Sequence, residues 1–324
     1  MLKKHILHRS LVLLALLASI SGCANSYGKL GVKEDAKVRS TPLADSKDPV
    51  AQLARALGKD LEIIQSPNYG ERRGPGQGKR PTELMIHYTA CEKERVVALF
   101  KKPDNVASHY LVDRQGNITR FVEESKRAWH AGGGAWHGNT DVNSTSIGIE
   151  NINLGYKHQE GHPPRQKVGG ASEEWYPYDE ALLHTLGPLC KDIVERYEIK
   201  PNNVIGHSDM TTIRATGFLG RKVDPGPLFP WERLHSTYDV GAWHNLKESL
   251  ERVEFPHRNQ TEWVREHLIK YGYPHPETWN EENTQKAVKT FQMHFRPSNI
   301  SGEIDEETIR ILASLVDRYI EAEN

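Results

Sequence analysis

Patterns typical of strands and helices alternate along the chain from about Leu61 to Trp231. Short apolar runs predict strands, and a longer stretch with apolar residues near a period of 3.6 predicts a helix over 178–197. The strands are expected at 84–88, 109–113, 118–122, 146–152 and 204–207, the second and third forming a hairpin. Such a mixture favours an α/β fold with one mixed central sheet flanked by helices.

The pattern changes after Pro256, where three amphipathic helices are expected. The apolar residues on their three faces are Trp263, Val264, Leu268 and Tyr271; Ala287, Val288, Phe291 and Phe295; and Ile309, Leu312 and Val316. Asp305 is placed to cap the last of these helices. The chain has 324 residues, enough for about two domains. We expect the larger domain at 56–240, a linker at 241–258 and a small three-helix domain at 259–324.

The N-terminus has the features of a secretory signal peptide. Basic residues, including Lys3 and Lys4, precede an apolar run over 11–18 that is too short to span a membrane. The run is followed by Gly22 and Cys23, which resemble the lipobox of bacterial lipoproteins. We therefore expect removal of residues 1–22 and lipidation of Cys23; the alternative is an ordinary signal peptide with a chance cysteine.

The residues after Cys23 predict where the anchored protein resides. Ala24 stands where an inner-membrane lipoprotein would carry Asp, so we expect anchoring in the outer membrane, facing the periplasm. A lipid anchor of this kind contributes about 0.8 kcal/mol per buried methylene. Segment 23–55 is polar and rich in small residues, which predicts a lipidated cysteine followed by a flexible tether.

Composition argues against some classes of function. Lys and Arg total 42 and Asp and Glu total 43, which gives a formal net charge of −1. Nucleic-acid-binding proteins usually carry a basic surplus, so we expect no nucleic-acid partner. Three cysteines are too few for a disulfide scaffold. Cys91 and Cys190 either pair in an oxidising compartment or remain two separate buried thiols.

Candidate reactive side chains stand at the ends of three predicted strands: His87, Glu150 and His207. Asp224 lies in a fourth segment further along the chain. Two imidazoles and one carboxylate can hold a zinc ion and leave one coordination position open, as in a hydrolytic site. A carboxylate that does not bind the metal can then transfer protons. The alternative is that each residue is an ordinary hydrogen-bonded group, because distant single ligands follow no spacing rule.

Six short segments contain or accompany these residues. They are Ile86–Ala90, His109–Asp113, Ala128–Gly132, Ser146–Asn151, His207–Asp209 and, as the most specific, Arg221–Trp231. Together they resemble the zinc-dependent N-acetylmuramoyl-L-alanine amidases of the type-2 family, which are related to the peptidoglycan recognition proteins. The resemblance implies the mixed-sheet fold of that family and one Zn²⁺ ion per chain.

The resemblance also assigns a role to each matching residue. It implies zinc ligands at His87, His207 and Asp224, a general base at Glu150, and an oxyanion-stabilising charge at Lys222. Lys222 precedes Asp224 by two residues, so both side chains can face one site on an extended segment. The stretch 210–220 is longer than in the family; it could reshape the cleft without breaking ligation, because longer loops add little closure entropy.

Other polar residues compete for a role in the site. Asp209 is either a second site carboxylate or a turn or cap residue, and we favour the cap. His109, His130 and His137 either shape the substrate groove or make structural hydrogen bonds. The polar stretch 158–174 contains several Gly and Pro residues and predicts a surface loop beside a cleft.

Two segments of the tail, Thr284–Gln292 and Gly302–Thr308, resemble a peptidoglycan-binding helical domain. The glycine-containing turn usual before the second helix is replaced here by Glu277–Asn280. The tail therefore either binds the cell wall or only braces the larger domain.

The resemblance to the type-2 amidases implies an enzyme that acts on peptidoglycan or muropeptides. It would cleave the amide between the lactyl group of N-acetylmuramic acid, or its anhydro form, and L-alanine of the stem peptide. We expect a monomer attached to the membrane through Cys23. One alternative is a non-catalytic peptidoglycan-binding lipoprotein on the same fold, although binding-only relatives typically lack part of the metal set. Another is a lipoprotein that links membrane and wall through its tail.

Overall fold

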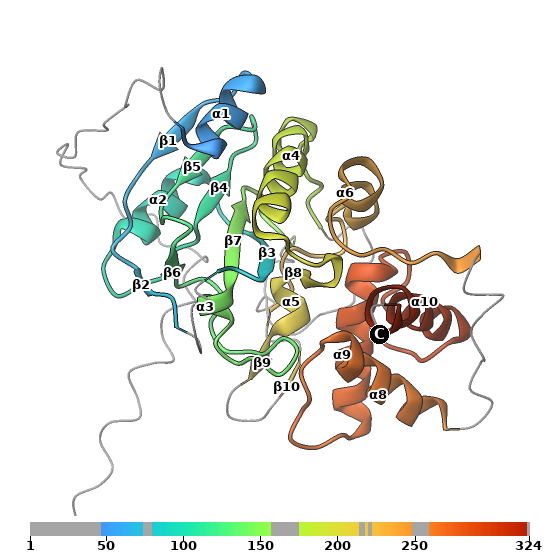
Figure 1. Cartoon of the computed structure of the whole chain (residues 1–324). Coiled ribbons are helices and arrows are strands. Elements are labelled where there is room, and N and C mark those ends of the chain that lie inside the picture. The colour runs from blue at the N-terminus through green and yellow to red at the C-terminus, as the bar shows by residue number, and fades with distance from the viewer. Residues whose placement is uncertain are drawn as a thin grey trace, which may run out of the picture. The chain divides into compact units, whose positions relative to one another are not determined.

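The computed structural model describes residues 47–73, 80–156, 175–213, 218–219, 222–247 and 259–322. The predicted signal peptide, Cys23, the stretch 158–174 and residues 248–258 of the predicted linker lie outside these residues. The described part contains a six-stranded sheet, two small two-stranded sheets and surrounding helices (Figure 1). None of its helices combines the length and the hydrophobicity needed to cross a bilayer.

The elements follow one another along the chain in the order that the alternating sequence pattern indicates. The strands are β1 (Leu61–Ile63), β2 (Tyr69–Glu71), β3 (Glu83–Tyr88), β4 (Tyr110–Val112), β5 (Ile118–Arg120), β6 (Lys126–Ala128), β7 (Ser146–Asn151), β8 (Val204–Gly206), β9 (Thr212–Ile213) and β10 (Phe218–Leu219). The helices are α1 (Pro49–Ala56), α2 (Lys93–Lys101), α3 (Val142–Thr145), α4 (Glu180–Tyr197), η3 (Pro201–Asn203), α5 (His207–Met210), α6 (Trp231–Tyr238), α8 (Gln260–Tyr271), α9 (Glu281–Phe295), α10 (Glu306–Val316) and the π-helical turn η4 (Asp317–Glu321).

The central sheet has the strand order β1-β5-β4-β7-β3-β8. Strands β4, β7, β3 and β8 are parallel, whereas β5 pairs antiparallel with β4 as the predicted hairpin requires. The mixed sheet predicted from the sequence is therefore confirmed. The strand expected at 204–207 is one residue shorter, because His207 already begins helix α5.

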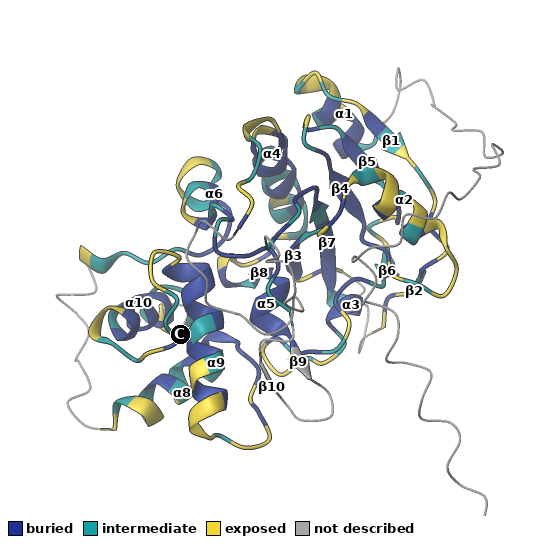
Figure 2. Ribbon diagram, turned by 180° about the vertical axis from the view of Figure 1, so that it is seen from behind, coloured by how far each residue is buried: buried dark blue, intermediate teal, exposed yellow. Residues whose placement is uncertain are grey.

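The two faces of the sheet are covered differently. Leu84 and Ile86 of β3 pack with α1, α4 and α6 in one hydrophobic cluster. Met85 of β3 and Ile205 of β8 point to the opposite face, because successive side chains alternate, and pack with the C-terminal helices. Further along this second face, Leu111 of β4 packs with α2. Figure 2 shows β3 and β7 as largely buried strands between these layers.

Helix α1 corrects the prediction for residues 49–55. Segment 23–55 was expected to be a tether, but its last residues form most of α1. Val50, Ala51 and Ala54 are at most 2% exposed and belong to the cluster beneath the sheet. The side chain of Asp48 accepts hydrogen bonds from the backbone N–H groups of Val50 and Ala51, which caps the helix. An aspartate followed by proline is a typical start of a helix, but the polar composition of segment 23–55 led us to predict a tether instead.

The two cysteines of the larger domain do not form a disulfide with each other. Cys190 is buried on α4 in the cluster that includes Leu84, whereas Cys91 is buried in the cluster around α2. They are two separate buried thiols, one of the two possibilities left open by the sequence.

The three helices predicted for the tail are α8, α9 and α10, with the π-helical turn η4 extending the last. Asp305 caps α10, since its Oδ1 accepts a hydrogen bond of 2.9 Å from the backbone N–H of Thr308. These helices do not form a core of their own. They share one hydrophobic cluster with Met85, Ile205 and Met210 of the larger domain.

Asp209 is the polar centre of this contact. Its Oδ2 accepts hydrogen bonds from the backbone N–H of Gly206 at 2.7 Å and from Nδ1 of His294 at 2.8 Å. Its Oδ1 accepts one from the Tyr273 hydroxyl at 2.9 Å. Only 1% of Asp209 is exposed, and the ring of His294 stacks on Trp231 at 3.8 Å. The capping role favoured from the sequence is therefore only half of what Asp209 does.

We expect Asp209→Ala to lower the free energy of unfolding by about 3 kcal/mol, because it leaves buried donors on both sides of the contact unpaired. Urea denaturation of the metal-free protein measures the effect. Glu195→Ala is the matched control: it removes a carboxylate that is 65% exposed and paired with Lys191, and should change stability by less than about 0.5 kcal/mol. Equal losses of unfolding free energy in the two variants would show that the buried contact around Asp209 stabilises the protein no more than an exposed ion pair does.

Candidate metal centre and active site

Sheet order brings the two candidate histidine ligands together. His87 lies near the end of β3, and His207 is the first residue after β8, the strand hydrogen-bonded to β3. The carboxyl ends of neighbouring parallel strands meet at one edge of a sheet, so the imidazoles meet although 120 positions separate them. Their Nδ1 atoms are 3.1 Å apart, and the residues are 2% and 3% exposed.

Asp224 completes the cluster from the loop before α6. Its Oδ2 lies 3.0 Å from Nδ1 of His87 and 3.0 Å from Nδ1 of His207. The backbone carbonyl of Asp224 accepts a hydrogen bond from the N–H of Ser208, which ties the loop to α5. A Cβ on Gly206 would lie 2.7 Å from Pro225 Cδ, so only glycine lets the loop approach this closely. The structure thus brings together the three residues that the family resemblance implies as zinc ligands.

The three ligand atoms fit a divalent metal ion. They all lie within 4.8 Å of one another, and they form the one candidate metal cluster found among the described residues. Two imidazole nitrogens and one carboxylate oxygen are ligands that zinc accepts, with a fourth position left for water or substrate. Three such acceptors directed at one point repel one another unless a cation or protons lie between them.

The protonation states suit metal binding. Burial lowers the pKa of His207 to about 4, although the charge of Asp224 opposes the shift. Burial alone would raise the pKa of Asp224, but the adjoining imidazoles of His207 and His87 and the positive charge of Lys222 hold it well below its usual value. Near neutral pH, His207 is therefore neutral with a lone pair available and Asp224 is ionised, as metal ligands must be.

Glu150 lies beside this cluster on the same face of the sheet, because it is the register partner of His87 on β7. Its Oε2 atom is enclosed and has no hydrogen-bond partner in the described structure. Burial raises the pKa of Glu150 to about 7; the charges of His87 and Lys222 oppose the shift and that of Asp224 adds to it. A carboxyl group that exchanges a proton near neutral pH is suited to general acid–base chemistry.

Lys222 is the remaining residue of the predicted set. Its backbone N–H donates a hydrogen bond of 3.2 Å to the Thr211 hydroxyl, and its side chain is only partly exposed. Its positive charge lies close enough to lower the pKa of both Glu150 and Asp224. The structure thus places a cation next to the candidate metal cluster. The stretch 210–220 beside it is described only in part, where β9 and β10 pair antiparallel.

The other predicted histidines do not join the ligand cluster. His109 is fully buried; its Nδ1 accepts a hydrogen bond from the N–H of Gly148, and burial lowers its pKa to about 3. His137 lies beside Asn202, with a ring nitrogen 3.2 Å from the Asn202 side chain. His130 is 8% exposed, and its Nδ1 lies 3.0 Å from Nε2 of His87. The last contact was not foreseen, although Ala128–Gly132 had been singled out as a family-like segment.

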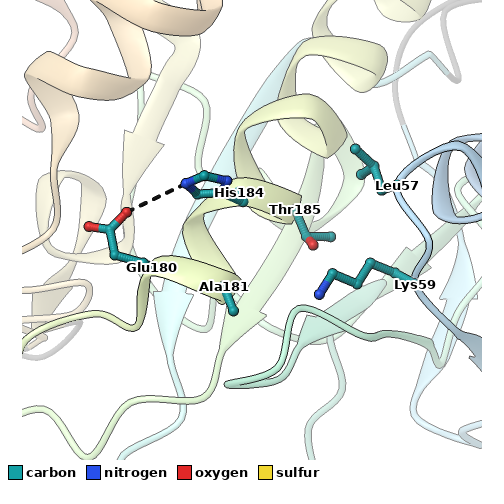
Figure 3. A pocket seen from close by; sticks show the side chains of 6 residues that line it. All are labelled: Leu57, Lys59, Glu180, Ala181, His184 and Thr185. Carbon is teal, nitrogen blue, oxygen red and sulfur yellow. Dashed lines mark ion pairs between the residues drawn. The ribbon is translucent and has the colours of Figure 1, made fainter.

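A separate hollow of about 400 Å³ lies between α4 and the turn after α1, elements that cover the opposite face of the sheet from His87 (Figure 3). Its charged side chains already have partners. The Lys59 ammonium donates to the carbonyl of Gln115, and Glu180 forms ion pairs with His184 and Arg233. The hollow has no counterpart to the convergent ligands of the metal centre.

A buried His–His–Asp cluster beside a carboxyl group of raised pKa defines the type of site found in metal-dependent hydrolases. The chain belongs to the N-acetylmuramoyl-L-alanine amidase family. The model of that family matches residues 77–227, and a model described as a putative peptidoglycan binding domain matches residues 257–312. The resemblance inferred from the short motifs is therefore confirmed, as is the assignment of the chain to amidases.

Individual relatives support this assignment over most of the chain. The N-acetylmuramoyl-L-alanine amidase AmiD of Escherichia coli is 38% identical over 286 residues, which cover 83% of this chain and 95% of the relative. The 1,6-anhydro-N-acetylmuramyl-L-alanine amidase AmpD of Haemophilus influenzae is 28% identical over 58% of this chain and 97% of its own length.

Two solved structures resemble the fold with a TM-score of 0.62 each. One is E. coli AmiD in complex with the substrate anhydro-N-acetylmuramic acid-L-Ala-D-gamma-Glu-L-Lys; it is 34% identical and covers 78% of this chain and 98% of its own. The other is AmpDh3 from Pseudomonas aeruginosa in complex with an anhydromuramic pentapeptide; it is 33% identical and covers 79% of this chain and 98% of its own.

The raised pKa of Glu150 predicts a pH-dependent stability. The folded protein holds a proton on Glu150 up to about pH 7, whereas an unfolded chain loses it near pH 4.5. Stability is therefore lost as pH rises through this window, by at most about 3 kcal/mol. We expect Glu150→Gln to gain stability relative to the wild type between pH 4.5 and 7.5, measured by denaturation of the metal-free proteins. A stability difference between Glu150→Gln and the wild type that stays flat across this pH range would contradict the raised pKa.

Proposed function

We propose that this chain is a zinc-dependent amidase that hydrolyses the bond between the lactyl group of N-acetylmuramic acid, or its anhydro form, and L-alanine of the stem peptide. The observation that carries the proposal is the convergence of His87, His207 and Asp224 beside the unpartnered carboxyl oxygen of Glu150. The muramyl peptides named in the AmiD and AmpDh3 complexes support this class of substrate.

In this proposal His87 and His207 bind the zinc ion through their Nδ1 atoms and Asp224 binds it through Oδ2. When bound, zinc supplies Lewis acidity, which polarises a carbonyl group and acidifies water. Zinc is favoured by the donor set, because two imidazoles and one carboxylate suit it better than they suit calcium or magnesium.

Glu150 and Lys222 carry the steps assigned to protein groups. Glu150 takes a proton from the attacking water at Oε2, and the water oxygen forms a bond to the lactyl carbonyl carbon. Lys222 places its positive charge near the negative charge that develops on the carbonyl oxygen. Glu150 then gives the proton to the L-alanine nitrogen as the carbon–nitrogen bond breaks, so one carboxyl group acts as base and then as acid.

A non-catalytic receptor was the main alternative from the sequence. The complete set of His87, Glu150, His207, Lys222 and Asp224 favours catalysis over binding alone.

For the tail, we propose that residues 259–322 brace the larger domain through the contact around Asp209 and also take part in wall binding, as the match to a peptidoglycan-binding model supports. Residues 49–56 form helix α1, and we propose the division into a larger domain, a linker and a helical tail with the remaining bounds given by the sequence.

Purified muropeptides test the function directly. We expect the zinc-loaded protein to release the free stem peptide, detected by mass spectrometry, and chelation to abolish release. Glu150→Gln should lower turnover by about 100- to 10,000-fold, since it removes the proton-transferring group, while zinc binding persists. Glu195→Gln, an exposed carboxylate on α4, is the control with wild-type turnover. Intact muropeptides with the zinc-loaded wild type would refute the amidase, and near-normal turnover of Glu150→Gln would refute the role of its carboxyl group.

We further propose that the protein is a monomer held at the periplasmic face of the outer membrane through lipid on Cys23. The supporting sequence is the basic and apolar leader ending in Gly22–Cys23, followed by Ala24. Cys23→Ser should move the protein from the membrane fraction to the soluble fraction, because the thiol that carries the lipid is lost. Ser26→Ala is the control with unchanged membrane association. Membrane retention of Cys23→Ser in cell fractionation would rule the anchor out.

A further inference from the structure

A buried chain of hydrogen bonds leads from β7 to the metal centre, and its proton positions can be assigned. The hydroxyl oxygen of Ser146 lies 2.6 Å from the carbonyl oxygen of Val142. Two oxygens at this distance must share a proton, and only the serine carries one. The Ser146 hydroxyl therefore donates to Val142, and toward any other group it can only accept.

The next group in the chain is His130. Its Nε2 lies 3.1 Å from the Ser146 oxygen, so Nε2 must carry the proton and donate it. A neutral imidazole carries a single proton, and in His130 that proton is on Nε2, so Nδ1 has none. Nδ1 of His130 is then an acceptor, 3.0 Å from Nε2 of His87. His87 consequently donates from Nε2, which leaves its Nδ1 to the metal.

Ala131, the residue after His130, fixes the proton position of the second ligand, His207. The carbonyl oxygen of Ala131 lies 2.8 Å from Nε2 of His207. A carbonyl oxygen can only accept, so His207 carries its proton on Nε2 and presents a bare Nδ1 to the cluster. Two consecutive residues thus determine which nitrogen of each ligand faces the metal.

The dipeptide His130–Ala131 is itself held firmly. The side-chain oxygen of Asn143 accepts hydrogen bonds from the backbone N–H groups of His130 at 3.0 Å and of Ala131 at 2.8 Å. The ring of His130 lies against Gly148 of β7, where a Cβ would come within 2.5 Å of Nδ1. Glycine at this position provides the space that the ring occupies.

We propose that His130–Ala131 fixes the tautomers of both histidine ligands, with His130 as a positioning residue that acts through His87. The proposal deepens the zinc amidase function and rests on it. In metal sites the second nitrogen of a ligating histidine is usually held by an acceptor that fixes ring and tautomer. Here one acceptor is itself an imidazole, and its own proton is directed by Ser146.

Zinc affinity tests the proposal without relying on turnover. His130→Leu removes the acceptor but retains apolar bulk, so the zinc dissociation constant, measured by competition with a chromogenic chelator, should rise by about 10- to 100-fold. His130→Asn retains an acceptor near the position of Nδ1 and should lose less. The control is His109→Leu, another buried histidine, whose ring nitrogens contact Gly148, Lys126 and Arg72 but neither ligand. This variant should leave the affinity within about threefold of the wild type.

Ser146→Ala provides a second test if His130→Leu does not fold. It leaves the fold intact because the carbonyl of Val142 keeps its bond from the backbone N–H of residue 146. The affinity should fall, because His130 is no longer forced to hold its proton on Nε2. Unchanged affinity in the folded variants, or an equal loss in His109→Leu, would overturn the proposal.

A spectroscopic measurement on the metal-free wild type is independent of zinc. Long-range proton–nitrogen spectra should show Nε2 of His87 and of His207 protonated, and His130→Leu should lose this preference at His87. A wild-type His87 without a proton on Nε2 would overturn the proposal. Failure of the wild type to bind zinc would instead refute the proposed function, and the spectra would still decide the tautomers.

Discussion

The structure is organised around three converging ligand atoms that repel one another when no cation lies between them. Nδ1 of His87, Nδ1 of His207 and Oδ2 of Asp224 lie 3.0 to 3.1 Å apart with no apolar group between them. Their lone pairs converge in a buried place where repulsion is only weakly screened. Neighbouring parallel strands, a tight approach at Gly206 and the backbone bond from Ser208 hold them there. The geometry becomes favourable when a cation occupies the common point, which is the sense in which the fold is prepared for a metal.

The rest of the sheet leaves space for this site. One face is sealed by α1, α4 and α6, whereas the other is covered at two separate places, by α2 and by the C-terminal helices. His87 and Glu150 lie on the strip between those two clusters. Glu150 remains without a hydrogen-bond partner on this strip, and burial raises its pKa to about 7. Burying Glu150 without a partner lowers the stability of the fold, and it also produces a carboxyl group that can exchange a proton near neutral pH.

Much of this could be predicted from local sequence. Apolar runs located β3, β7 and β8, helical periodicity located α4 and the three tail helices, and motifs singled out the five residues of the site. What local sequence could not supply were contacts between residues far apart in the chain. His130 is 43 positions from His87, and His294 is 85 positions from Asp209. Nothing near either histidine specifies its partner, so the sequence left His130 between a functional and a structural role and did not single out His294. Helix α1 was missed because small and polar residues surround its single capping signal.

The shared cluster beneath the C-terminal helices bears on how this chain can be recombined. Met85, Ile205 and Met210 are covered by side chains from the tail, and Asp209 depends on it for two of its three donors. The tail is therefore not an exchangeable cassette. A chimera that fused another wall-binding module after α6 would expose apolar surface and leave Asp209, two residues from His207, without two of its three hydrogen-bond donors. Shuffling would have to transplant the matching face of the sheet together with the tail.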